Sequence, residues 1–162
     1  MTPEISAWIN KAERDWRSVL LEHSVERDPN LDAVCFHAQQ CSEKYLKARL
    51  VLSSIAFRKS HDLLYLHQLA LDAEPTWHFL WQPLRDLTAF AVAIRYPGLD
   101  ATQQQADDAI KHCRIVRLTV RRSLELPDLD QSIKVCAGHF DRLITSTYRV
   151  FFHSALNIVK NS

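Results

Sequence analysis

The chain has 162 residues, of which 47% are hydrophobic and 24% charged, values typical of one soluble globular domain. It contains two glycines, which disfavours a turn-rich β fold, and its formal net charge of +1 gives no global attraction to nucleic acid or membrane. No apolar run approaches the roughly 20 residues that a membrane-spanning helix needs, so we do not expect an integral membrane protein.

The first helix is predicted from Thr2-Pro3 to about His23, because a capping hydroxyl followed by proline is typical of a helix start. Its apolar residues recur every three or four positions and predict one buried face. They are Ile5, Trp8, Ile9, Ala12, Trp16, Val19 and Leu20.

The second helix is predicted from a cap at Asn30 or Asp32 to about Ser54, after a break at residues 27–30. Small residues along it let neighbouring helices approach closely, so we expect it to be the central helix. Its expected inner side is Ala33, Val34, His37, Ala38, Cys41, Tyr45, Ala48 and Leu52. We expect Lys44, Lys47 and Arg49 to point elsewhere.

A short third helix is predicted from a cap at Ser60 or Asp62 to about Ala70, and Pro75 opens a turn after it. Pro83 lacks a backbone donor and predicts a break near residue 82, so the fourth helix is expected over about 83–95.

The sequence Tyr96-Pro97-Gly98 ends the fourth helix, and Asp100 or Thr102 caps a fifth that runs to about Leu124. The expected core positions of the fifth helix are Ala106, Ala109, Ile110, Cys113, Val116 and Val120. A sixth, amphipathic helix is predicted from Asp128 or Asp130 to about Val159. It has two open placements, on its own bundle or across a subunit interface.

The four cysteines, Cys35, Cys41, Cys113 and Cys136, contain no CxxC pair and lack the dense spacing of a disulfide-stapled scaffold. The N-terminus shows no basic region followed by an apolar core and a cleavage site. We therefore expect a reduced, cytoplasmic protein.

Three motifs follow one another along this helical pattern: the stretch from Cys35 to Leu50, His61-Asp62-Leu63, and Arg95-Tyr96-Pro97. With them the chain resembles the HEPN family (higher eukaryotes and prokaryotes nucleotide-binding) over about residues 5 to 124. The resemblance implies an all-α, up-and-down bundle of about five helices over residues 1–126, related to nucleotidyltransferase substrate-binding bundles. Residues 127–162 then add the C-terminal helix.

The resemblance also implies a homodimer that interacts with a nucleotide or RNA, and a separately encoded minimal nucleotidyltransferase as partner in a toxin-antitoxin-like pair. Two alternatives remain open. One is an active metal-independent ribonuclease toxin with a non-standard motif, and the other is a non-catalytic interaction module without a nucleotide.

Many ribonucleases of the family carry Arg, then four to six residues, then His. Arg95 resembles that arginine, but the three allowed positions hold Asp100, Ala101 and Thr102. A guanidinium can bind phosphate, and an imidazole can move a proton at neutral pH, whereas an aspartate is ionised and a poor proton donor. Catalysis by the usual route is therefore not expected, and Arg95 and Asp100 are the catalytic candidates that remain.

The candidates for binding nucleotide or phosphate are Arg95, Tyr96, His61, Lys44, Arg114, Arg117 and Arg121. Three of them have a structural alternative: Arg95 can satisfy helix C-terminal carbonyls, Tyr96 can pack with Pro97, and His61 can take part in helix capping. The last three arginines, with Lys111 and Arg122, form a basic stripe on the fifth helix. That stripe can track a phosphate backbone or be a solvated flank paired with acids of another helix.

His37 and Cys41 lie one helical turn apart, as two metal ligands can, but no HExxH or CxxC pattern accompanies them. We interpret them as a core-facing histidine and a small apolar filler, and expect no metal or cofactor. Arg149 and His153 share a helix face four residues apart and are the candidates for a displaced site.

Overall fold

The computed structural model describes residues 1–94 and 98–127, and in these ranges it contains five α-helices, one 3₁₀ helix and no strand. The helices are α1 (Pro3–His23), α2 (Leu31–Leu52), α3 (Leu63–Ala70), the 3₁₀ helix η1 (Pro75–Leu80), α4 (Trp81–Ala93) and α5 (Gln103–Ser123). This confirms the predicted all-α fold class. The predicted C-terminal helix, with Arg149 and His153, lies outside the described residues.

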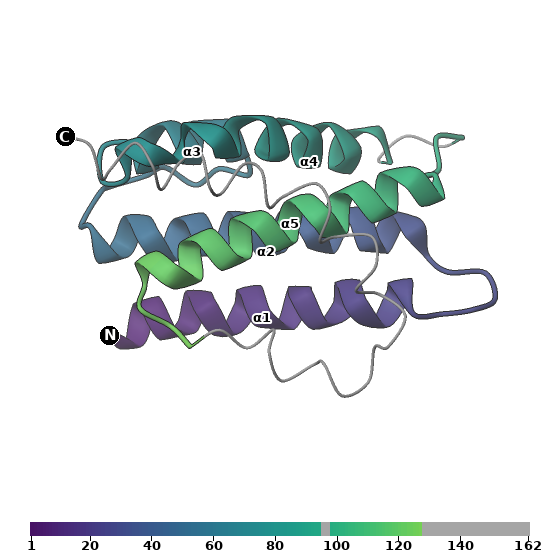
Figure 1. Cartoon of the computed structure of the whole chain (residues 1–162), viewed down its shortest axis with the longest axis horizontal. Coiled ribbons are helices and arrows are strands. Elements are labelled where there is room, and N and C mark those ends of the chain that lie inside the picture. Colours follow the sequence, from purple (N-terminus) through teal and green to yellow (C-terminus); the bar gives the residue numbers. More distant parts are fainter. Residues whose placement is uncertain (95–97, 128–162) are drawn as a thin grey trace, which may run out of the picture. The chain divides into compact units, whose positions relative to one another are not determined.

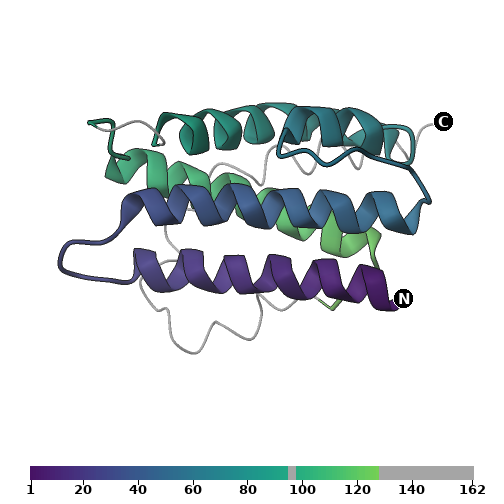
Figure 2. The ribbon, with the colours of Figure 1, turned by 180° about the vertical axis from the view of Figure 1, so that it is seen from behind.

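The described helices form an up-and-down bundle in which α1 and α2 run side by side in opposite directions, and α3, η1 and α4 together form the next leg (Figure 1). Figure 2 shows α1, α2 and the α3–α4 layer in the same order from behind. Because α2 packs against α1, α3, α4 and α5, the prediction of a central helix is confirmed.

The helix starts follow from local capping. Thr2 Oγ1 accepts a hydrogen bond from the amide of Ile5 at 3.3 Å, with Pro3 at the first helical position. At the start of α5, Thr102 and Gln105 form a capping box, in which each side chain bonds to the other residue's backbone amide. Both starts agree with the sequence prediction.

The fourth helix differs from its predicted bounds. The 3₁₀ helix η1 passes directly into α4 at Trp81, so Pro83 is the third residue of α4 and not the site of a break. An amide in the first turn has no partner within the helix, so proline costs no hydrogen bond there. The helix ends at Ala93, and residues 95–97 are outside the described ranges.

The core consists of the predicted apolar faces, with α2 buried on nearly all sides. The predicted core residues of α5 are all buried, and so are Ile5, Ile9, Ala12, Trp16 and Val19 of α1. Several expectations for α2 are wrong: Leu52 is exposed, whereas Lys47 is 6% exposed and Lys44 faces Asp15 of α1. Lys47 is buried because neighbouring elements cover its side of α2, and it keeps its charge partnered through Glu43.

Candidate functional site

The loop between α4 and α5 carries Arg95 and Tyr96, and both lie outside the described residues. The part of the loop that follows is fixed to the start of α2, because the amide of Ala101 donates to Asp32 Oδ1 at 2.7 Å. Gly98 has φ 86°, a left-handed conformation that glycine adopts readily.

The three positions at the family's histidine spacing are described. Asp100 is exposed, Ala101 has no titratable group, and the Thr102 hydroxyl accepts the amide of Gln105 at 3.2 Å as the cap of α5. Of these three side chains, Asp100 alone carries a carboxylate.

Arg117 and Arg121, two of the predicted phosphate-binding residues, lie inside the bundle. They are 2% and 4% exposed. Arg117 forms a two-point ion pair with Glu13 of α1, with Nε–Oε1 and Nη2–Oε2 distances of 2.8 and 3.0 Å. Arg121 Nη1 lies 3.2 Å from the same carboxylate. The sequence allowed, as an alternative to phosphate binding, a solvated flank paired with acids of another helix. The acid partner is present, but Arg117 and Arg121 are not solvated, because α5 turns them toward α1 and α2.

Tyr45 of α2 completes this buried network by donating its hydroxyl to Glu13 and accepting from Arg121 Nη1 at 3.0 Å. Burial alone raises the pKa of Glu13, but the hydrogen bonds from Arg117 and Tyr45 and the two arginine charges outweigh it, so the pKa lies below its usual value. Burial and the bond to Glu13 raise the pKa of Tyr45. The network therefore holds an ionised carboxylate and a neutral phenol.

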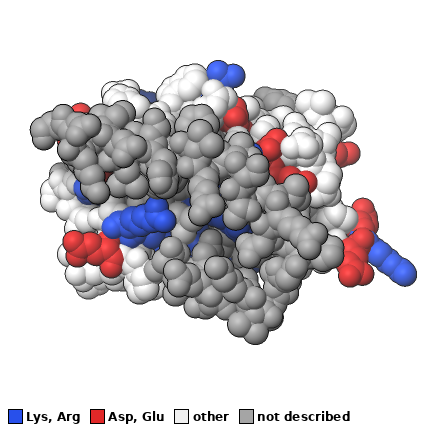
Figure 3. Space-filling model, in the orientation of Figure 1, with Lys and Arg blue, Asp and Glu red and all other residues white. Residues whose placement is uncertain are grey.

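The remaining basic residues of α5 are more accessible. Arg114 is half-buried with its guanidinium 5.8 Å from the Trp16 ring centroid, and Lys111 and Arg122 are exposed. On the face drawn in Figure 3, Lys and Arg side chains gather over α5. In the described part of the chain, the basic character of this helix thus divides into a buried pair and an outer set.

Lys44, another predicted binding residue, lies on the side of α2 that faces α1. Its Nζ lies 2.5 Å from Asp15 Oδ2 and 3.0 Å from Gln40 Oε1. His37 Nδ1 lies 2.9 Å from the other oxygen of Asp15. The ring of His37 is hydrogen-bonded as predicted, but it is partly exposed and held by Asp15, while Cys41 is fully buried.

His61 stands at the end of the α2–α3 connection with its ring beside Glu43 of α2. Its Nδ1 lies 3.0 and 3.2 Å from the two carboxylate oxygens. The Glu43 side chain is 3% exposed, whereas the His61 side chain is 75% exposed. An exposed imidazole is therefore held in place by a buried carboxylate.

Gln40 joins these two clusters, because it contacts Lys44 and also donates to Glu43 Oε2 at 3.3 Å. The structure thus brings Lys44 and His61 into one polar network along α2. Arg117 and Arg121 belong to the separate network around Glu13.

The sequence interpretation missed all three acids that organise these networks: Glu13, Asp15 and Glu43. The one signal for them was the Glu43–Lys47 spacing of four, which is typical of a helical ion pair.

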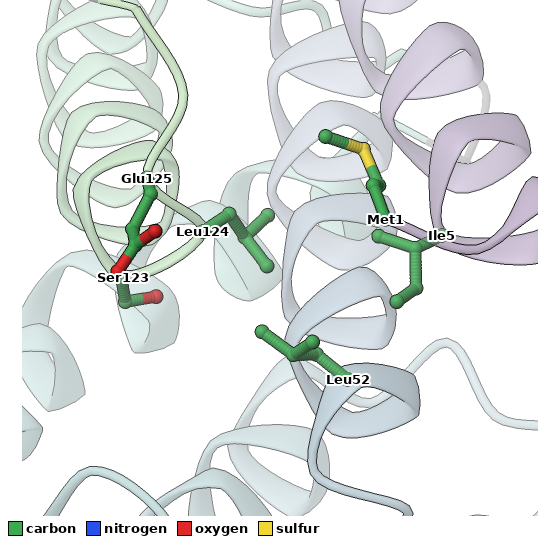
Figure 4. Close-up of a pocket in the computed structure, with 6 residues that line it drawn as sticks. All are labelled: Met1, Ile5, Leu52, Ser123, Leu124 and Glu125. Atoms are coloured by element: carbon green, nitrogen blue, oxygen red, sulfur yellow. The ribbon is translucent and has the colours of Figure 1, made fainter.

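A pocket of about 310 Å³ lies between α1, α2 and the end of α5, lined by Met1, Ile5, Leu52, Ser123, Leu124 and Glu125. Figure 4 shows its mainly apolar side chains. None of the predicted site residues lines it.

Within the described ranges, no group of three or more His, Cys, Asp or Glu side chains is arranged to hold a metal ion. None of the described helices has the length and apolar character required to cross a membrane.

Comparison with known proteins gives the same assignment as the motifs. The chain matches the HEPN domain over residues 5–123, a family associated with nucleotide- and RNA-related roles in general. The crystal structure of an archaeal HEPN homologue superimposes with a TM-score of 0.56 and 22% identity, covering 74% of this chain and 97% of that chain. No curated protein matches the sequence. Because the HEPN domain matches most of this chain, the chain belongs to the HEPN domain family.

Proposed function

We propose that this HEPN protein binds RNA or a nucleotide through the Arg95 loop and does not cleave RNA by the family's usual ribonuclease route. The observation that carries the proposal is the composition of the loop: Arg95 is present, and positions 100–102 hold no histidine. Two of these positions serve the fold, since Ala101 binds Asp32 and Thr102 caps α5.

The chemistry supports binding without cleavage. An arginine guanidinium binds a phosphate through two parallel hydrogen bonds and needs no partner to do so. Cleavage of RNA also requires a group that moves a proton near pH 7, a role that an imidazole fills. Asp100 is exposed to solvent, where an aspartate is ionised and holds no proton to donate.

We further propose that the protein acts as a homodimer and as the partner of a minimal nucleotidyltransferase encoded beside it. Both proposals are supported by family membership. Light scattering of the purified full chain tests the dimer. Affinity purification with a co-expressed nucleotidyltransferase from the neighbouring reading frame tests the partnership, with the same enzyme expressed alone as the control.

The decisive experiment incubates end-labelled structured RNA with purified full-length protein in a chelator and reads cleavage on a denaturing gel. Filter binding of the same RNA is measured in parallel for wild type, Arg95→Ala and Arg27→Ala, because Arg27 is exposed in the α1–α2 connection and serves as a matched control. We expect no cleavage, and weaker binding for Arg95→Ala alone, by about tenfold for one charged contact.

Two results would contradict the proposal. Cleavage by wild type that Arg95→Ala abolishes identifies an active ribonuclease with a non-standard motif. A dimer that binds neither RNA nor nucleotide is a structural interaction module instead.

A further inference from the structure

The pairing of His61 with Glu43 joins a surface ring to an interior acid. Four side chains point hydrogen-bond donors at the Glu43 carboxylate. Lys47 Nζ and Gln39 Nε2 lie 2.8 and 3.2 Å from its oxygens, and Gln40 Nε2 and His61 Nδ1 lie 3.3 and 3.0 Å away. A carboxylate with this many fixed donors has little freedom to move, so it sets the orientation of the ring it holds.

The arrangement also fixes which nitrogen of His61 faces a ligand. An ionised carboxylate accepts hydrogen bonds and does not donate them, so Nδ1 carries a proton. Nε2, on the outer edge of a ring that is 75% exposed, is left for solvent or a ligand. In the imidazolium form Nε2 also carries a proton and is a charged donor.

The ring is not needed to hold the α2–α3 connection in place. The backbone carbonyl of His61 accepts a hydrogen bond from Gln39 Nε2 at 3.1 Å. The Asp62 carboxylate caps α3 by accepting the amides of Leu64 and Tyr65 at 3.0 and 3.1 Å. An exposed side chain contributes little to stability, so orienting it with a buried acid indicates a role at the surface.

The charged groups around the ring favour an anion. From α2, Glu43 faces His61, and the charge of Lys47 offsets it. Arg58 and Lys59 precede His61 in the connection and are both exposed, and the Arg58 guanidinium lies 4.6 Å from the Tyr65 ring centroid. Asp62, the one acid of residues 58–62, is engaged at the start of α3. Arg58 and Lys59 carry two positive charges and Asp62 one negative charge, so residues 58–62 have a formal charge of +1 that protonation of His61 increases.

We propose that Arg58, Lys59 and His61 form a second phosphate-binding site, separate from the Arg95 loop, that contacts the RNA backbone. His61 binds as the imidazolium through Nε2, and Glu43 acts as its positioning residue. The inference rests on the proposed function, since it assumes that the protein binds RNA. Because an imidazole takes up its proton between about pH 8 and pH 5, RNA binding at this site strengthens as the pH falls.

The test measures fluorescence anisotropy of a labelled single-stranded RNA at pH 8 and pH 6, at constant ionic strength, with the full-length protein. We expect wild type to bind about fivefold or more tightly at pH 6. His61→Gln should lose this gain, whereas His78→Gln should keep it, because His78 is an exposed histidine in η1. Replacing both Arg58 and Lys59 by Gln should make the RNA affinity less dependent on salt concentration, by the amount expected for the loss of about two phosphate contacts.

Glu43→Gln tests the positioning role, because it keeps the shape of the side chain and removes the charge that faces Nδ1. We expect the pH-dependent gain to shrink in this variant while binding at pH 8 stays near the wild-type value. A fluorescent ATP analogue distinguishes the sources of phosphate. If His61→Gln loses the tighter binding at pH 6 for RNA but not for the ATP analogue, the site recognises the RNA backbone. If it loses the tighter binding for both probes, the site recognises any phosphate group.

The outcomes separate this inference from the proposed function. If wild type binds RNA and His61→Gln keeps the full gain at pH 6, the second site is wrong and the Arg95 proposal stands. If wild type binds neither probe at either pH, both fail. Circular dichroism of each variant verifies that the bundle is folded.

Discussion

Arg117 of α5 and Glu13 of α1 form a two-point ion pair across the bundle, at 2.8 and 3.0 Å, although 104 residues separate them in the sequence. Arg121 and Tyr45 bind the same carboxylate, so one acid ties α1, α2 and α5 together. A buried arginine is costly to desolvate, and a well-aligned carboxylate offsets that cost.

Replacing Glu13 by Gln should therefore destabilise the fold. The change keeps the shape of the side chain and removes the negative charge that faces two buried guanidinium groups. We expect the free energy of unfolding to fall by about 3 kcal/mol, measured by urea denaturation followed by circular dichroism. Glu26→Gln, in the exposed α1–α2 connection, should change it by less than about 0.5 kcal/mol. Equal stabilities of the two variants would show that the network does not stabilise the bundle.

Buried histidines should make the fold less stable in mild acid. Burial lowers the pKa of His67, outweighing the hydrogen bond of its Nε2 to the Trp77 carbonyl at 2.9 Å, and burial also lowers the pKa of His112. Each group thus has a lower pKa in the folded than in the unfolded state, and the unfolded state takes up more protons between the two values. The free energy of unfolding should therefore be highest above about pH 6.5 and should decrease as the pH falls below that value.

The measurement is the urea midpoint at pH 7.5, 6.5 and 5.5. His67→Gln keeps a donor near the Trp77 carbonyl but does not titrate, so its stability should vary less with pH than that of wild type. An unchanged pH dependence in His67→Gln would assign the effect to other groups.

The cysteines of the described helices should be unreactive in the folded protein. Cys35, Cys41 and Cys113 are buried, and burial raises the pKa of Cys35 to about 11, with a contribution from the charge of Asp32. The pKa of Cys41 is also raised by burial and by its contact with Cys113. Since the thiolate is the reactive form, a Cys136→Ser protein should not react with a thiol reagent at pH 8. All three thiols should react in denaturant, and fast labelling without denaturant would contradict this burial.

Restoring the family's histidine tests the proposal that the protein lacks ribonuclease activity because positions 100–102 hold no histidine. Asp100 is exposed, so Asp100→His places an imidazole at an allowed spacing from Arg95 with little cost in stability. We expect this variant to cleave structured RNA in a chelator, and a further Arg95→Ala change to abolish the cleavage. Gln104→His, exposed but beyond the allowed spacing, is the control. If Asp100→His binds RNA and does not cut it, the missing histidine is not what prevents cleavage.

Much of the fold could be predicted from the sequence, because helix starts and buried faces depend on residues three or four positions apart. Thr2 and Thr102 cap the helices predicted from them, and the expected apolar face of α5 is buried. The start of α4 was misplaced because the prediction treated Pro83 as a helix breaker. In the first turn of a helix, proline displaces no hydrogen bond.

The sequence alone determined the all-α class, the order of the helices, the family motifs and the absence of a histidine at positions 100–102. These features are local or can be read directly from residue types. Tertiary structure decided which charged residues face inward. Arg117, Arg121 and Lys47 have long side chains whose surroundings depend on the helix packed opposite them. They are buried as ion pairs, the two arginines with Glu13 and the lysine with Glu43. The sequence pattern of one helix carries no information about that opposing partner, so only the folded bundle distinguishes an arginine on the surface from one that stabilises the core.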